Sequence, residues 1–225
     1  MRKLFFLMGL FFVLPLSVAA EGIEAGKNQV NLYLETAFGL DRTGVEFTEG
    51  KDYAWGNAGV GMGLSYLYYP SSHLGIGIDG SIKGFQGTKR EEWYHYGHHW
   101  YMDEAELTMQ QFQLLGAARL YLNPESRVRL YVPLGAGISI VNGEMEYKSD
   151  YYWDRYEENY TSTSFAYYAG VGLEFETNNG LAFGLEARYN AFDYNMGKLA
   201  DRVGAPSSVG KEKYEYVSLL FTVGF

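Results

Sequence analysis

The 225-residue sequence contains no cysteine, which excludes disulfide bonds and the lipid attachment that needs a cysteine after an export signal. A long apolar run is missing as well. After residue 20, no segment approaches the roughly 18 consecutive apolar residues of a membrane-spanning helix. A helical membrane protein is therefore not predicted.

Positive charge is scarce. Arg2 and Lys3 belong to the predicted export signal described below. Without them, the chain has 16 basic and 27 acidic residues, a formal charge of −11. This argues against nucleic acid as a partner, because nucleic-acid-binding proteins present a basic surface. In contrast, the chain has 28 glycines and 21 tyrosines. Strands normally disfavour glycine and favour tyrosine, and together they are typical of a narrow barrel with small residues inside and aromatic residues around the outside.

Residues 1–20 have the composition of an export signal. Its three parts are a basic start, an apolar core and small residues for cleavage: Arg2 and Lys3, residues 4–16, and Val18-Ala19-Ala20. The core of 13 residues is too short to cross a bilayer as a helix. We expect export by the Sec pathway, cleavage near Ala20, and a single domain over residues 21–225. An export signal without cysteines is common in bacterial envelope proteins.

The segment 214–225 alternates between apolar and small or polar residues. Every second residue from Val217 to Phe225 is apolar, which is the period of a β-strand with two unlike faces. Lipid can cover such a face if the strand edges are paired into a closed barrel. Seven more segments alternate in the same way, which predicts eight strands: 28–40, 55–69, 73–86, 106–122, 128–140, 163–177, 181–191 and 214–225.

Pro133 conflicts with the prediction of a regular strand at 128–140. The strand at 128–140 has apolar residues at all its outward positions, but Pro133 falls on its inner face. A closed barrel has no free edge at which proline is normally tolerated. We therefore expect a β-bulge at this position.

The predicted connections alternate in length. The short ones are 70–72, 123–126 and 178–180, and the long ones are 41–54, 87–105, 142–162 and 192–213. Short turns at one mouth, long loops at the other and an even strand number match bacterial outer-membrane barrels. The chain resembles the small eight-stranded barrels of the OmpX and OmpA membrane-domain type across essentially the whole length after residue 20. The predicted fold is all-β, an eight-stranded antiparallel up-and-down transmembrane β-barrel.

The last strand also resembles the C-terminal strand by which such barrels are recognised for insertion. This resemblance implies that Phe221 and Phe225 form an assembly signal and that the barrel-assembly machinery is a partner. A soluble barrel of the lipocalin type alternates as well, but its apolar face points inward. The large apolar residues here could not all fit inside eight strands, whereas glycine and paired charges could, so we assign the apolar face to lipid.

Charged residues are predicted to face the barrel interior. Acidic and basic members are equal in number, so they can pair: Glu35, Asp79, Glu174, Glu186, Lys83, Arg119, Arg129 and Arg188. Buried charges are tolerated only when paired, and side chains just fill the interior of eight strands. We expect a structural plug rather than an ion path or a solute pore.

Residues with catalytic or metal-binding chemistry are few. His95, His98 and His99 could ligate Zn²⁺ or Cu²⁺, but their spacing matches no strong metal signature, and an aromatic surface loop is the competing interpretation. The other histidine, His73, lies beside a predicted turn without a convincing partner for nucleophilic catalysis. We predict no cofactor, no catalytic residue and no enzymatic activity.

The long loops carry residue types that are common in contact surfaces. Residues 144–160 include six acidic residues, five tyrosines and one tryptophan. Tyrosine and tryptophan provide binding area at low entropic cost, although a solvated hairpin with cross-strand tyrosine pairs would look the same. The predicted contact residues are Trp93, Trp100, Tyr151, Tyr152 and Trp153.

The resemblance and the loops together imply a role. We expect a monomeric, non-enzymatic protein of the bacterial outer membrane with a structural and surface-interaction, adhesin-like function. A narrow channel or carrier for small apolar solutes is the alternative. The expected partners are outer-membrane lipid and lipopolysaccharide, the barrel-assembly machinery, and a host or surface ligand bound through the loops.

Overall fold

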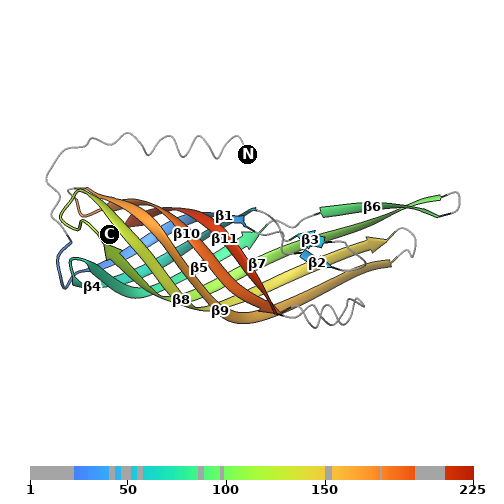
Figure 1. Cartoon of the computed structure of the whole chain (residues 1–225), viewed down its shortest axis with the longest axis horizontal. Coiled ribbons are helices and arrows are strands. Elements are labelled where there is room, and N and C mark those ends of the chain that lie inside the picture. Colours follow the sequence, from blue (N-terminus) through green and yellow to red (C-terminus); the bar gives the residue numbers. More distant parts are fainter. Residues whose placement is uncertain are drawn as a thin grey trace.

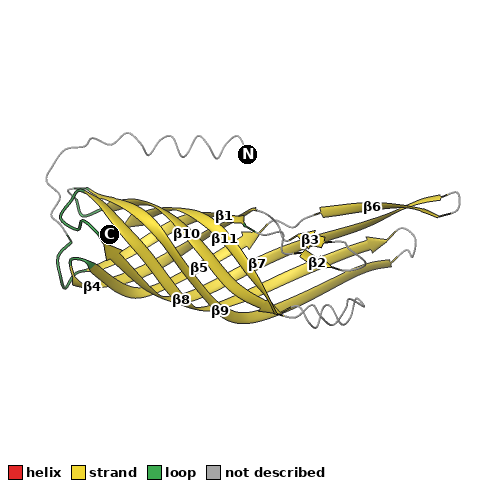
Figure 2. Ribbon diagram, viewed as in Figure 1, coloured by secondary structure: helices red, strands yellow, loops and turns green. Residues whose placement is uncertain are grey.

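The structure, a computed structural model, describes residues 23–40, 44–46, 52–54, 58–85, 89–96, 99–149, 154–177, 179–195 and 211–225. The regular elements of these residues are strands (Figures 1 and 2). They are β1 (Asn28–Gly39), β2 (Gly44–Glu46), β3 (Asp52–Ala54), β4 (Ala58–Ser71), β5 (Leu74–Phe85), β6 (Lys89–Tyr96), β7 (His99–Tyr121), β8 (Val128–Ser149), β9 (Asp154–Glu176), β10 (Ala182–Asn195) and β11 (Lys211–Gly224). A search of the described residues finds no helix with the length and hydropathy of a membrane span. The predicted export signal, residues 1–20, lies outside them.

Eight strands form a closed antiparallel barrel in the order β1, β4, β5, β7, β8, β9, β10, β11. The barrel closes where β1 pairs with β11, from Asn31↔Gly224 to Gly39↔Tyr216. β6 pairs with β7 outside this ring, and β2 and β3 form a separate short hairpin. The predicted eight-stranded up-and-down barrel is confirmed.

The two faces of the wall differ as the alternation predicts. Leu34, Val60 and Val171 on the outer face are each more than 60% exposed, whereas charged residues on the inner face are buried. A water-soluble protein has the opposite arrangement. The continuous outer apolar band therefore requires an apolar surrounding rather than water. The predicted inward and outward faces of the barrel strands, including that of Arg119, are confirmed.

The prediction of a β-bulge at Pro133 is wrong. The β8–β9 ladder pairs Tyr131 with Gly172 and resumes at Leu134↔Ala169 without a shift of register. Proline has no N–H to donate, so the ladder lacks pairs at positions 132 and 133 while both strands keep their course. A register shift occurs instead in the β4–β5 ladder, between Tyr68 and Ser71, where Pro70 lies.

The long connections are also shorter than predicted. The ladder between β7 and β8 continues to Asp103↔Ser149, and the ladder between β8 and β9 continues to Ser149↔Asp154. The segments 99–105, 142–149 and 154–162 are therefore strand, not loop. The backbone of these three segments remains paired across the strands. Their residues are mainly polar and aromatic, so they lack the apolar face by which the other strands were recognised.

Tyrosine lines the inside together with small residues, at positions that the alternation of the strands assigns to the inner face. Tyr33, Tyr131 and Tyr168 are buried there, and each faces a glycine directly across the ladder: Gly63, Gly172 and Gly135 respectively. A Cβ at any of these glycines would overlap the tyrosine ring opposite. Glycine thus leaves room for inward tyrosines as well as filling a narrow interior.

Candidate functional site

The projecting sheet is the part of the fold that extends beyond the barrel (Figure 1). We define it as β6, residues 99–108 of β7, 144–149 of β8 and 154–165 of β9. β5 pairs with β7 only up to Met109, and β10 pairs with β9 only from Ala166, so these segments continue past their barrel neighbours. β7 and β9 have 23 residues each and β8 has 22, compared with 12 in β1 and β5.

The projecting sheet is acidic and aromatic. It contains ten acidic and four basic residues, with two tryptophans and six tyrosines. The register places Glu106 opposite Glu146, and Glu146 opposite Glu157, on three neighbouring strands. The backbone register thus brings acidic positions of three strands into one row.

The predicted loop residues fall partly on this sheet. Trp93 pairs with Met102, and Trp100 pairs with His95. His99 pairs with Tyr96, so these two histidines occupy neighbouring ladder positions rather than opposite ones. His98, Tyr151, Tyr152 and Trp153 lie outside the described residues. In the part of the chain with described side chains, no group of three or more histidine and carboxylate residues is placed to hold a metal ion.

An aromatic cluster closes the barrel at the short-turn mouth. Tyr69, Tyr121 and Tyr131 pack there with Leu67, and Ile23 covers them from below. The Tyr121 and Tyr131 ring centroids are 5.3 Å apart, and those of Tyr69 and Tyr121 are 6.0 Å apart. Arg129 and Glu174 lie two ladder positions from Tyr131 on the side of the short turns, and Arg119 lies on the other side, so charged residues flank this cluster on both sides.

The first charged group lies beside this cluster, since the Tyr121 hydroxyl donates a 3.3 Å hydrogen bond to Glu174 Oε2. Arg129 Nη2 is 3.0 Å from Glu174 Oε1 and 2.7 Å from Glu176 Oε2. Arg119 lies 3.4 Å from Glu174 and 3.6 Å from Glu186, with its guanidinium 4.7 Å from the Tyr131 ring centroid. The Tyr131 hydroxyl donates a 2.8 Å hydrogen bond to Glu186. Each carboxylate of this group therefore has a cationic partner.

Arg188 is the centre of the second group. It pairs with Glu186 and lies 3.1 Å from Asp79 Oδ2, and its guanidinium is 4.1 Å from the Tyr168 ring centroid. Asp79 also accepts hydrogen bonds from the Tyr33 and Tyr168 hydroxyls. Because Glu186 contacts both Arg119 and Arg188, the two groups form one connected network.

Lys83 and Glu35 form a third, separate pair at 3.1 Å. Lys83 also donates to the Gln113 side chain at 2.8 Å and to the Tyr216 hydroxyl at 2.7 Å. All eight charged residues predicted to face the interior are buried and take part in these ion pairs. The four buried carboxylates balance the four buried cations.

A second aromatic layer lies at the extension mouth. Phe85, Phe192, Tyr214 and Tyr216 are buried together, with the Phe85 ring edge-on to both tyrosines at centroid distances of 5.6 and 5.5 Å. The described interior thus contains two aromatic layers and a charge-balanced set of four buried carboxylates and four buried cations. This arrangement can hold the barrel rigid, and it offers no activated nucleophile.

Alternation places Tyr33, Tyr121 and Tyr131 on the inner face with the charged residues, but it does not reveal which charge each tyrosine contacts. Four buried tyrosines contact the buried charged residues through a hydrogen bond or through the face of the ring: Tyr33, Tyr131, Tyr168 and Tyr216. Tyr33, Tyr131 and Tyr168 each lie opposite a glycine across the ladder, and these glycines could have indicated the tyrosine positions. This pairing can be recognised only when the register between strands is known.

Of the predicted assembly residues, Phe221 lies on the outer face of β11 and Phe225 directly follows that strand. Phe221 stacks on Phe183 with ring centroids 6.4 Å apart. Phe225 is exposed, and its backbone exchanges two 2.9 Å hydrogen bonds with Val30, which extends the closing ladder by one pair. Both residues therefore border the seam at which the first and last strands meet.

Comparison with known proteins places these features in context. Residues 6–225 match the family described as outer membrane protein beta-barrel domain. Two similar solved structures are Ail, the attachment invasion locus protein of Yersinia pestis, and the outer membrane protein OprG from Pseudomonas aeruginosa. Ail is 16% identical, with 89% of this chain and 99% of Ail covered and a TM-score of 0.44. OprG is 13% identical, with 91% and 98% covered and a TM-score of 0.44. No curated protein matches the chain.

Proposed function

This chain belongs to the family of outer membrane protein β-barrel domains, and on that premise we propose that it is a non-enzymatic surface-interaction protein of the bacterial outer membrane. The projecting sheet makes adhesin-like contacts with a partner outside the cell, and the barrel serves as its anchor. The export signal, cleavage near Ala20 and insertion by the barrel-assembly machinery belong to this proposal, as does a monomeric state.

One observation carries the proposal: the ladders of β7, β8 and β9 continue without a break beyond the barrel. An apolar band ~25 Å tall crossed at ~40° needs on the order of ten residues per strand. These strands have 22 or 23, so about half of each lies outside the membrane. A hydrogen-bonded platform loses less conformational entropy on binding than a loose loop does.

The charge of the projecting sheet selects the partner. Its acidic excess favours a partner with a basic surface, because complementary charge accelerates encounter and suppresses wrong partners. The backbone register places the acidic positions 106, 146 and 157 in one row across three strands, which concentrates this acidic excess.

The described interior does not favour the alternative, a channel or carrier for apolar solutes. Arg119, Arg188 and their carboxylates lie in the path between the two aromatic layers. An apolar solute would have to displace paired charges, which is strongly unfavourable in a low-dielectric interior. The lumen is therefore better suited to stability than to transport.

The test is a barrel with a shortened sheet. Replacing 91–104 and 146–157 by Asn-Gly turns leaves Arg90↔Ala105 and Met145↔Glu158 as the last pairs, so both ladders keep their register. Refolded wild type should bind at least one member of a panel of basic matrix and complement proteins, in a salt-dependent manner, and the shortened barrel should not. The matched control, Glu106→Gln/Glu146→Gln/Glu157→Gln, keeps the sheet and removes charge.

The control should bind more weakly than wild type without losing its heat-modifiable fold. Sucrose octasulfate, the heparin analogue bound to Ail in a solved structure, serves as an anionic probe that the acidic sheet should not bind. Equal binding by the shortened barrel would contradict the proposal, and so would a wild type that binds only the anionic probe.

A further inference from the structure

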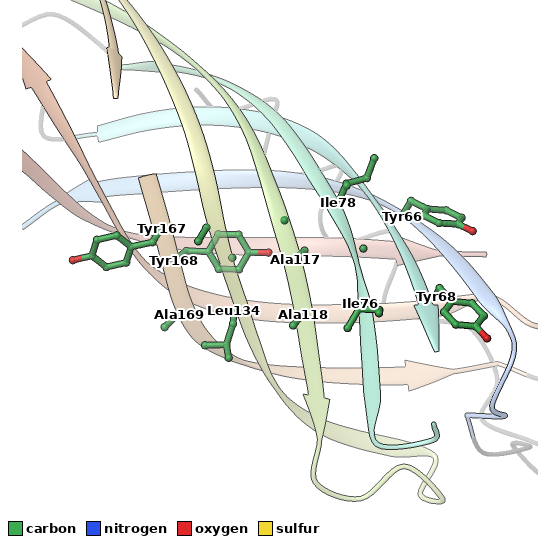
Figure 3. A pocket seen from close by; sticks show the side chains of 14 residues that line it. Tyr66, Tyr68, Ile76, Ile78, Ala117, Ala118, Leu134, Tyr167, Tyr168 and Ala169 are labelled. Atoms are coloured by element: carbon green, nitrogen blue, oxygen red, sulfur yellow. The ribbon is translucent and has the colours of Figure 1, made fainter. Parts of the chain in front are cut away.

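The lipid-facing wall carries a shallow groove over β4, β5, β7, β8 and β9 (Figure 3). Its volume is about 1010 Å³. One cross-strand row runs along it: Tyr66, Ile78, Gly116, Ala136 and Tyr167 are successive ladder partners. Small residues therefore form the middle of the groove and tyrosines stand at its two ends, as the rings of Tyr66 and Tyr167 show (Figure 3).

Packing of the barrel does not explain why Gly116 is small. A Cβ at Gly116 would meet only the Ala136 carbonyl oxygen, at an ordinary 3.6 Å. Gly135, one position from Ala136, differs because its Cβ would overlap the ring of Tyr168 inside the barrel. Ala118 and Ala169 on the neighbouring row are small as well. The surface is thus hollow where the fold itself would allow larger side chains.

One end of the groove reaches a charged group. Lys213 Nζ is 5.6 Å from the centroid of the Tyr167 ring and 2.6 Å from Glu215 Oε1. On β11 the outward apolar row ends at Val217, and Glu215 and Lys213 follow it toward the extension mouth. This end of the groove therefore lies at the edge of the apolar band, where lipid headgroups begin.

We propose that the groove is a binding site for one acyl chain of an anionic, phosphate-bearing lipid, whose phosphate is held by Lys213. The surrounding hydrocarbon supplies the occupant, because a concave apolar surface at this depth meets acyl chains before anything else. The ammonium group at its end complements an anionic headgroup and not a neutral one. This inference concerns the barrel wall and is independent of the projecting sheet.

Glu215 acts as an internal competitor in this site. It pairs with Lys213 at 2.6 Å and would yield to a phosphate that approaches from the headgroup region. A variant without this carboxylate should therefore hold the anionic lipid more strongly. That sign distinguishes a headgroup site from a lysine that merely stabilises the wall.

Native mass spectrometry of the refolded barrel tests the site. The probes are palmitoyl-oleoyl phosphatidylglycerol and phosphatidylcholine, which share acyl chains and differ in net charge. Wild type should retain one phosphatidylglycerol molecule in preference to phosphatidylcholine. Lys213→Gln should reduce that preference about fivefold, the order expected for one lysine near an anionic headgroup, and Glu215→Gln should increase it.

Gly116→Leu fills the groove and should abolish retention of both lipids. Its matched control is Gly84→Leu, because Gly84 is exposed on the same wall outside the groove and a Cβ there meets nothing within 4 Å. Lys27→Gln, at an exposed lysine paired with Glu24 near the short-turn mouth, is the control for charge. If Gly116→Leu does not fold, as judged by heat-modifiability, Ala136→Leu replaces it.

Three results would overturn the proposal. The first is lipid retention that Gly116→Leu and Ala136→Leu do not diminish. The second is an equal effect of Lys213→Gln and Lys27→Gln on headgroup preference. The third is that the wild type retains no lipid but forms protein dimers, which Gly116→Leu abolishes. The last result would mean that a second copy of the chain occupies the groove.

Discussion

Arg188→Ala removes the cation at the centre of the interior network. Arg188 is 3% exposed and pairs with both Asp79 and Glu186. Glu186 would keep Arg119 at 3.6 Å and the Tyr131 hydroxyl at 2.8 Å. Asp79 would lose its cation and keep only the hydroxyls of Tyr33 and Tyr168. The substitution therefore leaves one uncompensated carboxylate inside the barrel.

The magnitude follows from this difference between the two carboxylates. Breaking a buried ion pair by removing one partner costs about 3–5 kcal/mol. The two remaining hydrogen bonds to Asp79 offset part of this loss, because hydrogen bonds to a charged group contribute about 1.5–3 kcal/mol each. We expect the free energy of unfolding to fall by about 3 kcal/mol, the lower end of the range for a broken buried pair.

Urea titration in lipid vesicles, read as the folded fraction on unboiled gels, measures this change. Lys27→Ala is the control, since its exposed pair with Glu24 should contribute at most about 1 kcal/mol. Arg188→Ala/Asp79→Asn should recover part of the loss, because it restores a neutral interior. A midpoint for Arg188→Ala equal to that of wild type would place Arg188 in water and refute the network.

Three further predictions concern the wall. Gly172→Ala should destabilise the barrel by about 1–3 kcal/mol through overlap with the Tyr131 ring, whereas Gly84→Ala, where a Cβ meets nothing within 4 Å, should leave the urea midpoint unchanged. Deleting Phe225 should reduce the amount of assembled barrel in the outer membrane without affecting export, and normal surface labelling of the deletant would exclude an assembly role. Unboiled protein in detergent should migrate differently from boiled protein and give a β-type circular dichroism spectrum, because every strand of a closed barrel is paired; a helical spectrum would contradict the fold.

The barrel wall could be predicted because strand alternation depends on the backbone alone. A period of two places Leu34 and Glu35 on opposite faces whatever their neighbours are. The charged interior followed from the same rule, since a wall facing lipid leaves only one side for Arg119 or Glu174. Which carboxylate meets which cation depends on the stagger between strands, and the sequence does not reveal it.

The errors have one physical origin, the register between strands. The pairing of Tyr33 with Gly63 joins strands that a long connection separates, so neither residue alone indicates that this inward tyrosine lies opposite a glycine. The segments 99–105 and 154–162 lack an apolar face, and only cross-strand hydrogen bonds define them as strand. Pro133 needed no bulge, because a ladder can lose two pairs and resume in the same register.

The central claim is that the lumen is a sealed, charge-paired support and that the protein acts through its projecting sheet. Conductance of the refolded wild-type barrel in a planar lipid bilayer tests this most directly, with a known porin in the same membrane as the positive control. Because Arg119, Arg188 and their carboxylates fill the interior between two aromatic layers, we predict that insertion gives no ion-conducting steps. Stable unitary conductance that disappears with Phe85→Trp, at the aromatic layer of the extension mouth, would contradict the account and identify the lumen as a path.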